Sequence, residues 1–225
     1  AEPTASLWDC SEFIISAYKL EIGHPPGAPF FMLTANLFSQ FASDPSQVAY
    51  MVNIMSALLS AGCIMLLFWT VSHLMHRLLC GYAEVERMQN LLLIEGSALV
   101  GALACMFSDS FWYSAVEAEV YAYSSFLTAL VFWLMLKWDE EADAPGSDRW
   151  LLLISYFIGL SIGVHLLNLL CIPAMLLVYY FRRTRNVGMW GICKALLISF
   201  ALLGGILYGL IPGVLWLAGR VELLA

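Results

Sequence analysis

The stretch "SQVAYMVNIMSALLSAGCIMLLFWTVSHLMHRLL", residues 46–79, decides the fold class. A helix needs about 20 apolar residues to cross the roughly 30 Å of hydrocarbon in a bilayer. This stretch is longer than that, and Arg77 near its end is its first Asp, Glu, Lys or Arg residue. Asp44 and Pro45, just before it, are typical of a helix start. The stretch therefore predicts a long helix that crosses a membrane over roughly 47–72.

The composition of the whole chain agrees with this prediction. Of the 225 residues, 61% are hydrophobic and 12% are charged, and the mean hydropathy is +0.81. In a soluble domain, about a quarter of the residues are charged. We therefore predict an all-α protein, a polytopic bundle of transmembrane helices. The net charge of −7 argues against a nucleic-acid partner. The six cysteines form no CxxC pair and predict no metal site.

Further apolar runs predict spans over roughly 91–107, 118–138 and 191–213. The run over roughly 150–181 is either one overlong helix or a hairpin with two short arms. Basic residues decide between these, because cytoplasmic loops carry an excess of Lys and Arg. A hairpin that turns near "GVHLLN", residues 163–168, leaves eight basic residues on one side: Arg77, Arg87, Lys137, Arg149, Arg182, Arg183, Arg185 and Lys194. The prediction is therefore about six membrane segments.

This topology brings most of the other notable polar residues to the opposite, outer face. They are Asp9, Glu12, His24, Asp109, Glu117, Glu119, His165, Asn168, Arg220 and Glu222. Ionisable groups at membrane depth are costly unless they are paired or line a wet cavity. A group of such residues gathered from distant parts of the chain therefore predicts a functional site at this face.

Residues 1–46 are predicted to form an outer-face loop, followed by a single membrane domain over residues 47–225. Two stretches of the loop, "SEFIISAYKLEIG" and "FFMLTANLFSQFA", are typical of helices that lie on a membrane surface. The turn "GHPPGAP" between them is expected to be rigid, because proline restricts its own backbone and that of the residue before it. The loop is therefore expected to form a platform at the lipid boundary.

Several of these polar residues also have a local structural interpretation. Asp9 and Glu12 form a D-x-x-E pattern, close to a capping box at the start of a helix. Ser114 and Glu117 form an S-x-x-E box of the same kind. His165 could simply satisfy backbone groups at the turn of the hairpin. A structural role and a chemical role do not exclude each other at these positions.

Three blocks of the sequence carry a resemblance to a known family. They are "PTASLWDCSEFIISAYKLEIGHPPGAPFFMLTANLFS" (3–39), "FSDSFWYSAVEAEVYAYSSFLTALVFWLMLKW" (107–138) and "GLSIGVHLLNLLCIPAMLLVYYF" (159–181). The chain resembles the bacterial protein O-mannosyltransferase-like membrane family, which is common in Bacteroidota and was once filed as a domain of unknown function. That family is similar to the glycosyltransferase-C (GT-C) superfamily, whose members have an acidic motif in the first outer loop. Family members are longer, so the resemblance implies that this chain is part of a longer protein.

The resemblance implies an enzyme that moves a sugar, mannose, from a polyprenyl-phosphate donor to Ser or Thr of exported proteins. Asp9 matches the acid of the first outer loop and is the expected general base. Glu12 is expected to position the acceptor or to share its proton. The residues expected to contact the donor phosphate and sugar are His24, Asp109, Glu117, Glu119, Tyr121, His165 and Asn168. The expected location is the bacterial inner membrane, with the site facing the periplasm. With so many carboxylates, a bound divalent metal is compatible with the sequence, although no ligand spacing requires one.

Two other functions stay open on the sequence alone. A transporter or flippase for a lipid-linked or anionic solute would bind near the middle of the membrane, at helices broken by Gly or Pro. Pro173 and "LLGGILYG" keep this alternative open. A non-catalytic subunit of a larger membrane complex would use Asp9 and Glu12 only to cap a helix. One cavity shared by Asp9, Glu119 and His165 would favour the enzyme.

Overall fold

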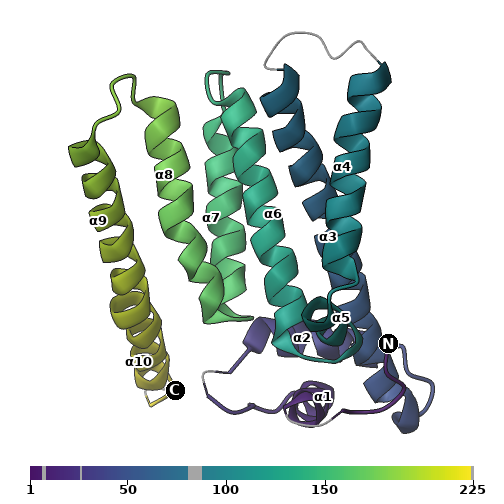
Figure 1. Ribbon diagram of the computed structural model, residues 1–225. Helices are drawn as coiled ribbons and strands as arrows, with labels where there is room; N and C mark the ends of the chain where they lie inside the picture. Colours follow the sequence, from purple (N-terminus) through teal and green to yellow (C-terminus); the bar gives the residue numbers. More distant parts are fainter. Residues whose placement is uncertain (7–8, 26, 81–87, 224–225) are drawn as a thin grey trace.

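The computed structural model describes residues 1–6, 9–25, 27–80 and 88–223, and every regular element in this part of the chain is helical. Six helices run alongside one another: α3 (Val48–Cys80), α4 (Met88–Met106), α6 (Val120–Glu141), α7 (Asp148–Ile162), α8 (Cys171–Arg183) and α9 (Met189–Gly205) (Figure 1). Three shorter helices lie across one end of this bundle: α1 (Cys10–Lys19), α2 (Pro29–Ser39) and α5 (Asp109–Val116). The all-α class predicted from the composition is confirmed.

Four helical stretches are long and apolar enough to cross a membrane. They are Pro45–Leu79, Val120–Glu141, Leu166–Arg183 and Met189–Val221. A fifth span results if Asn90–Met106 and Asp109–Val116, which meet at 67°, form one broken span. Helix α7 has only 15 residues, a rise of about 22 Å, and is not among these candidates. The described residues thus hold four or five candidate spans, and the count of about six stays a prediction.

The predicted hairpin is present. Helix α7 ends at Ile162, the chain turns, and a short 3₁₀ helix, η2 (Leu166–Leu170), leads into the returning helix α8. The C-terminal ends of α3, α6 and α8 lie together at one end of the bundle, which we call the basic end. Helices α1, α2 and α5 and the turn after α7 lie at the other end, which we call the short-helix end (Figure 1). Arg87 lies outside the described residues.

Ion pairs join three helices at the basic end. Asp139 of α6 is paired with Arg77 of α3 and with Arg182 of α8, whose Nε lies 3.4 Å from Oδ1 of Asp139. Arg182 also reaches Asp143, with 2.6 Å between Nη2 and Oδ2. The Asp139 side chain is only 11% exposed. Because a buried charge is costly without a partner, these contacts fix how α3, α6 and α8 pack.

At the short-helix end, α1 and α2 are packed onto the bundle by a shared apolar core. Phe13 of α1 and Phe31 of α2 meet edge to face, with 5.3 Å between ring centroids, and both belong to a buried cluster with residues of α3 and α6. The side-chain amide of Asn36 donates hydrogen bonds to the carbonyls of Ala17 and Tyr18. The two predicted outer-loop helices are therefore present, and they are held in fixed positions on α3 and α6.

Two local predictions can be compared with the structure. Asp44 caps the start of the helix before α3, as predicted, because its carboxylate accepts a hydrogen bond from the Ser46 N–H at 2.8 Å. The predicted capping box of Ser114 and Glu117 is wrong. Ser114 lies inside α5, where its hydroxyl donates to the Ser110 carbonyl, and Glu117 follows the last residue of that helix. Helix α5 instead begins at Asp109, a start the prediction missed.

The last span is longer than predicted. Instead of ending near residue 213, the helix passes through one π-helical turn, Ile206–Leu210, and continues as α10 (Ile211–Glu222). Proline inside a helix lacks a hydrogen-bond donor and crowds the preceding turn. The wider π turn, which ends at Leu210 two residues before Pro212, accommodates this, so the helix does not break there.

Candidate functional site

A cavity of about 920 Å³ lies at the short-helix end of the bundle. One part of its wall is polar and includes Asp9, His24, Glu119, Tyr121 and His165. Asp9 directly precedes α1, and His24 lies in the loop between α1 and α2. Glu119 and Tyr121 lie where α6 begins, and His165 lies in the turn after α7. Folding therefore brings five of the nine predicted site residues onto one cavity wall.

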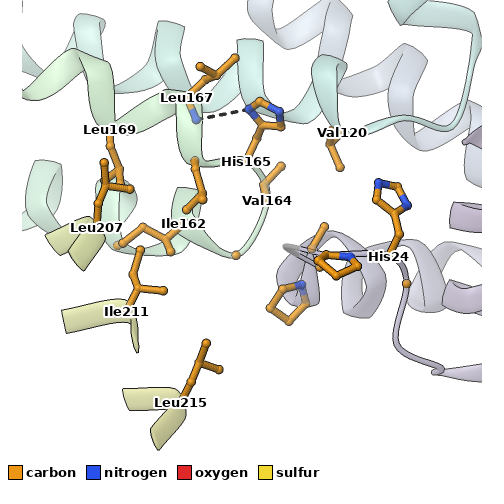
Figure 2. A pocket seen from close by; sticks show the side chains of 18 of the residues that line it. His24, Val120, Ile162, Val164, His165, Leu167, Leu169, Leu207, Ile211 and Leu215 are labelled. Carbon is orange, nitrogen blue, oxygen red and sulfur yellow. Dashed lines mark hydrogen bonds between the residues drawn. The ribbon is translucent and has the colours of Figure 1, made fainter. Parts of the chain in front are cut away.

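The other part of the wall is apolar. Helices α9 and α10 and the π turn between them contribute Leu203, Leu207, Leu210, Ile211, Val214 and Leu215. Figure 2 shows Leu207, Ile211 and Leu215 on the side of the cavity away from His24. Sequence reasoning missed this wall, because nothing distinguishes these side chains from the many other leucines of the spans. The cavity is thus amphipathic, with a polar end and an aliphatic side.

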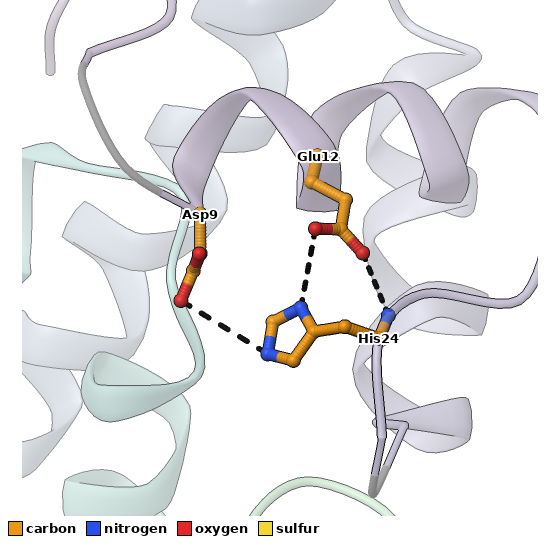
Figure 3. A group of neighbouring side chains, drawn as sticks. All are labelled: Asp9, Glu12 and His24. Carbon is orange, nitrogen blue, oxygen red and sulfur yellow. Dashed lines mark hydrogen bonds and ion pairs between the residues drawn. The ribbon is translucent and has the colours of Figure 1, made fainter.

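Asp9, Glu12 and His24 form a compact group at the polar end (Figure 3). Glu12 accepts a hydrogen bond from the His24 N–H at 2.6 Å, and its second oxygen lies 3.2 Å from the ring Nδ1. The Nε2 atom of His24 lies 4.0 Å from Oδ2 of Asp9. The backbone N–H and then the ring of His24 hold the pKa of Glu12 below its usual value. Glu12 thus fixes the position of His24, and Nε2 points toward Asp9.

Neither Asp9 nor Glu12 behaves as a simple helix cap. Asp9 precedes the first residue of α1, but its side chain makes no capping hydrogen bond. Glu12 turns to His24, twelve residues further along the chain. The group could also hold a divalent cation, since one ligand atom from each of the three side chains lies within 4.8 Å of the others. Carboxylate and imidazole are suitable donors for such an ion.

His165 faces the cavity from the turn after α7. Its Nδ1 accepts a hydrogen bond from the Leu167 N–H at 3.3 Å, so it caps η2 (Figure 2). Burial lowers the pKa of the imidazole, which favours the neutral ring. A neutral ring that accepts at Nδ1 carries its proton on Nε2. His165 therefore has a backbone-capping role and keeps one N–H donor for a ligand.

Glu119 is the second carboxylate on the cavity wall. Burial raises its pKa above the usual value, and the negative charges of Glu117 and Asp9 raise it further. Among the described residues, no Lys or Arg lines the cavity, so no guanidinium or ammonium charge from the wall offsets this effect. Arg220 does not reach the wall and lies over the Trp216 ring instead. Glu119 therefore holds its proton more tightly than an ordinary glutamate does.

Four predicted site residues do not line the cavity. They are Glu12, Asp109, Glu117 and Asn168. Asn168 is buried, and its carbonyl oxygen accepts hydrogen bonds from the hydroxyls of Ser124 and Thr128, which attach η2 to α6. Asp109 is exposed in the first turn of α5. Glu117 adjoins the wall, where its charge acts on Glu119. The side chain of Glu222 lies outside the described residues.

The fold and the cavity together define a class: a polytopic helical membrane protein with an amphipathic cavity at one end. Residues 9–188 match the family described as protein O-mannosyl-transferase TMEM260 N-terminal domain, and the chain belongs to this family. It is 30% identical over 157 residues to "Protein O-mannosyl-transferase TMEM260" of Mus musculus, covering 68% of this chain and 19% of the relative.

A second relative is the Dictyostelium discoideum protein named "Protein O-mannosyl-transferase tmem260". The two are 25% identical over 133 residues, which cover 59% of this chain and 14% of the relative. No solved structure matches the chain. The chain therefore spans less than a fifth of the length of each of these relatives, and all residues of the polar cavity wall fall inside the family match.

Proposed function

We propose that this chain carries the donor site of a membrane protein O-mannosyltransferase of the GT-C type. The donor is a polyprenyl-phosphate mannose, and the acceptor is a Ser or Thr of an exported protein. The site faces the periplasm from a bacterial inner membrane. Family membership supports the activity. The observation that carries the proposal is the amphipathic cavity in which Asp9, His24, Glu119 and His165 meet a wall of leucines.

The two sides of the cavity match the two parts of such a donor. A prenyl chain is apolar and packs against the aliphatic side chains of α9 and α10 that line the cavity. The phosphate and the sugar then lie at the polar end, near His24 and His165. The cavity lies at one end of the bundle, whereas a transporter is expected to bind near the middle of the membrane.

In the proposed step, the acceptor hydroxyl oxygen attacks C1 of the mannose. Asp9 takes the hydroxyl proton as the new C1–O bond forms. The bond between C1 and the phosphate oxygen breaks, and its electron pair leaves with the polyprenyl phosphate. This adds one negative charge to the phosphate. The His165 ring donates its Nε2–H to that charge as it develops, and the His24 ring, held through Nδ1 by Glu12, has only Nε2 to contribute.

The remaining residues support this step. Glu12 holds His24 in place rather than contacting the acceptor, which revises the role expected from the sequence. Glu119 and Tyr121 contact sugar hydroxyls. Glu117 tunes Glu119 through its charge. Asn168 keeps the turn that carries His165 attached to α6.

The test is sugar transfer by the full-length protein with Asp9→Asn. Purified protein in proteoliposomes is given radiolabelled polyprenyl-phosphate mannose and a Ser/Thr-containing acceptor protein. Losing a general base lowers the rate by about 10²- to 10⁴-fold. Asp109→Asn is the matched control, because Asp109 is an exposed aspartate at the same end that does not line the cavity. Transfer by Asp9→Asn at the rate of this control would remove Asp9 as the base.

A further inference from the structure

We infer that Gly163 is a positioning residue that sets the separation between the two imidazoles of the cavity. Its carbonyl oxygen and its lack of a side chain together hold α2 against the turn after α7. The loop before α2 carries His24, and the turn carries His165. The consequence for sugar transfer rests on the proposed function, whereas the geometric consequence does not.

The first observation is a pair of backbone hydrogen bonds. The N–H groups of Phe30 and Phe31 both donate to the Gly163 carbonyl, at 2.8 Å and 3.3 Å. The first N–H groups of a helix have no partner within the helix. Pro29, the first residue of α2, has no N–H at all. One carbonyl from the α7 turn thus satisfies the next two free donors of α2 and ties the two elements together.

The second observation is the closeness of the two backbones. A Cβ atom added at Gly163 would lie 2.9 Å from Cβ of Phe30 and 3.3 Å from its backbone nitrogen. Those atoms move only if α2 moves. The backbone angle φ of Gly163 is −76°, a value that any residue adopts. The need for glycine at this position is therefore steric and comes from α2.

The third observation is the place of this contact in the cavity. Both residues line it: Pro29 follows the loop that carries His24, and Gly163 lies in the turn that carries His165. Val164, next to Gly163, and Phe31, two residues after Pro29, are 2% and 0% exposed in the same apolar core. A shift of α2 away from the turn would therefore change the spacing of the polar wall and disturb the packing beneath it.

The kinetic test is Gly163→Ala in the full-length enzyme. A misplacement of about 1 Å can lower kcat/KM by up to about 100-fold. A displacement of a few tenths of an ångström is therefore expected to lower kcat/KM about tenfold, as a rise in the KM for the polyprenyl-phosphate donor. Simple destabilisation would instead reduce the amount of folded enzyme and lower the maximal rate at unchanged KM. Gly101→Ala in α4 is the control, because a Cβ added there meets nothing within 4 Å. An unchanged donor KM in Gly163→Ala would overturn the inference.

A coupling test isolates the steric cause. Phe30→Gly removes the Cβ atom that the new methyl group would strike, at the expense of the contact between the Phe30 and Tyr123 rings. In this background, Gly163→Ala should have little further effect on the donor KM. If the two effects simply add, the close contact with Phe30 is not the cause.

A distance measurement separates this inference from the proposed function. Spin labels carried by unnatural amino acids replace Ile22 and Leu167, two exposed residues on the two sides of the cavity. The distance distribution between the labels should broaden or shift in Gly163→Ala and stay as in the parent in Gly101→Ala. An unchanged distribution in Gly163→Ala contradicts the positioning role. If the parent protein transfers no sugar, the proposed function fails, and this measurement still decides the role of Gly163.

Discussion

The two ends of the bundle both carry carboxylates, but they use them differently. At the basic end, the buried Asp139 is paired with Arg77 and Arg182 from two other helices. At the short-helix end, Asp9 and Glu119 line a cavity, and in the described part of the chain neither is paired with a Lys or Arg. Among the described residues, the ion-pair partner of Asp9 is the ring of His24, 4.0 Å away.

This difference separates structural charges from chemical ones. A carboxylate held between two guanidinium groups has its charge balanced and its position fixed, so its main effect is on helix packing. A carboxylate beside a cavity without a Lys or Arg neighbour is available to take a proton or to bind a ligand. We therefore expect substitutions at the basic end to change stability, and substitutions at the cavity to change activity.

The largest expected effect on stability is that of Asp139→Asn. Removing the shared carboxylate takes away the buried charge that both guanidinium groups contact, which should cost about 3 kcal/mol of unfolding free energy. Thermal or denaturant unfolding of the protein in detergent measures this. Asp143→Asn is the matched control, since Asp143 pairs with the same Arg182 but its side chain is 78% exposed. The control should cost less than about 1 kcal/mol. Equal losses in the two variants would break the comparison.

The next largest effect is expected for Glu12→Gln. Glutamine can still accept the hydrogen bond from the His24 N–H, but it loses the charge beside the imidazole. Transfer should fall about tenfold, the low end of the range for removing a carboxylate that orients an imidazole. Glu12→Ala should in addition speed hydrogen exchange at the His24 amide, and Glu12→Gln should not. An unchanged transfer rate in Glu12→Gln would show that His24 needs no orienting charge.

The smallest effect is expected for Glu119, and it depends on pH. Its pKa is raised in the folded protein, so the folded state binds the proton more tightly than the unfolded state does. The stabilising contribution of this proton is complete below the ordinary glutamate pKa and is lost as pH rises through the raised value. Glu119→Gln should therefore raise the free energy of unfolding at neutral pH by less than about 1 kcal/mol. Unfolding measured from pH 4 to 8 checks this. The stability of the parent should fall as pH rises through the raised Glu119 pKa, and the stability of the variant should fall less.

Much of the architecture could be predicted from the sequence because the membrane limits the choices. Apolar runs located the long helices, and the bias of basic residues correctly favoured the hairpin between α7 and α8. The gathering of Asp9, Glu119 and His165 at one end followed from that topology. These predictions rest on hydrophobicity and charge, which act over whole segments and tolerate small local errors.

The details that sequence reasoning missed depend on contacts between distant segments. The pattern at Asp9 and Glu12 resembles a cap, but in the folded protein the Glu12 carboxylate accepts a hydrogen bond from His24 instead. The need for glycine at position 163 depends on the approach of Phe30, which no local pattern reveals. The leucine wall of the cavity depends on where α9 and α10 lie beside the turn. Tertiary contacts of this kind leave no local signal in a single sequence.

The most direct test of the account compares Asp9→Asn and Asp139→Asn in one assay. Sugar transfer from polyprenyl-phosphate mannose is measured per amount of folded protein, with unfolding followed in parallel. We predict that Asp9→Asn keeps the stability of the parent and loses at least about 100-fold in transfer rate. Asp139→Asn should lose stability and keep a near-normal rate per folded molecule. A parent-like rate in Asp9→Asn, or a matching loss of rate in Asp139→Asn, would contradict the division between a reactive end and a structural end.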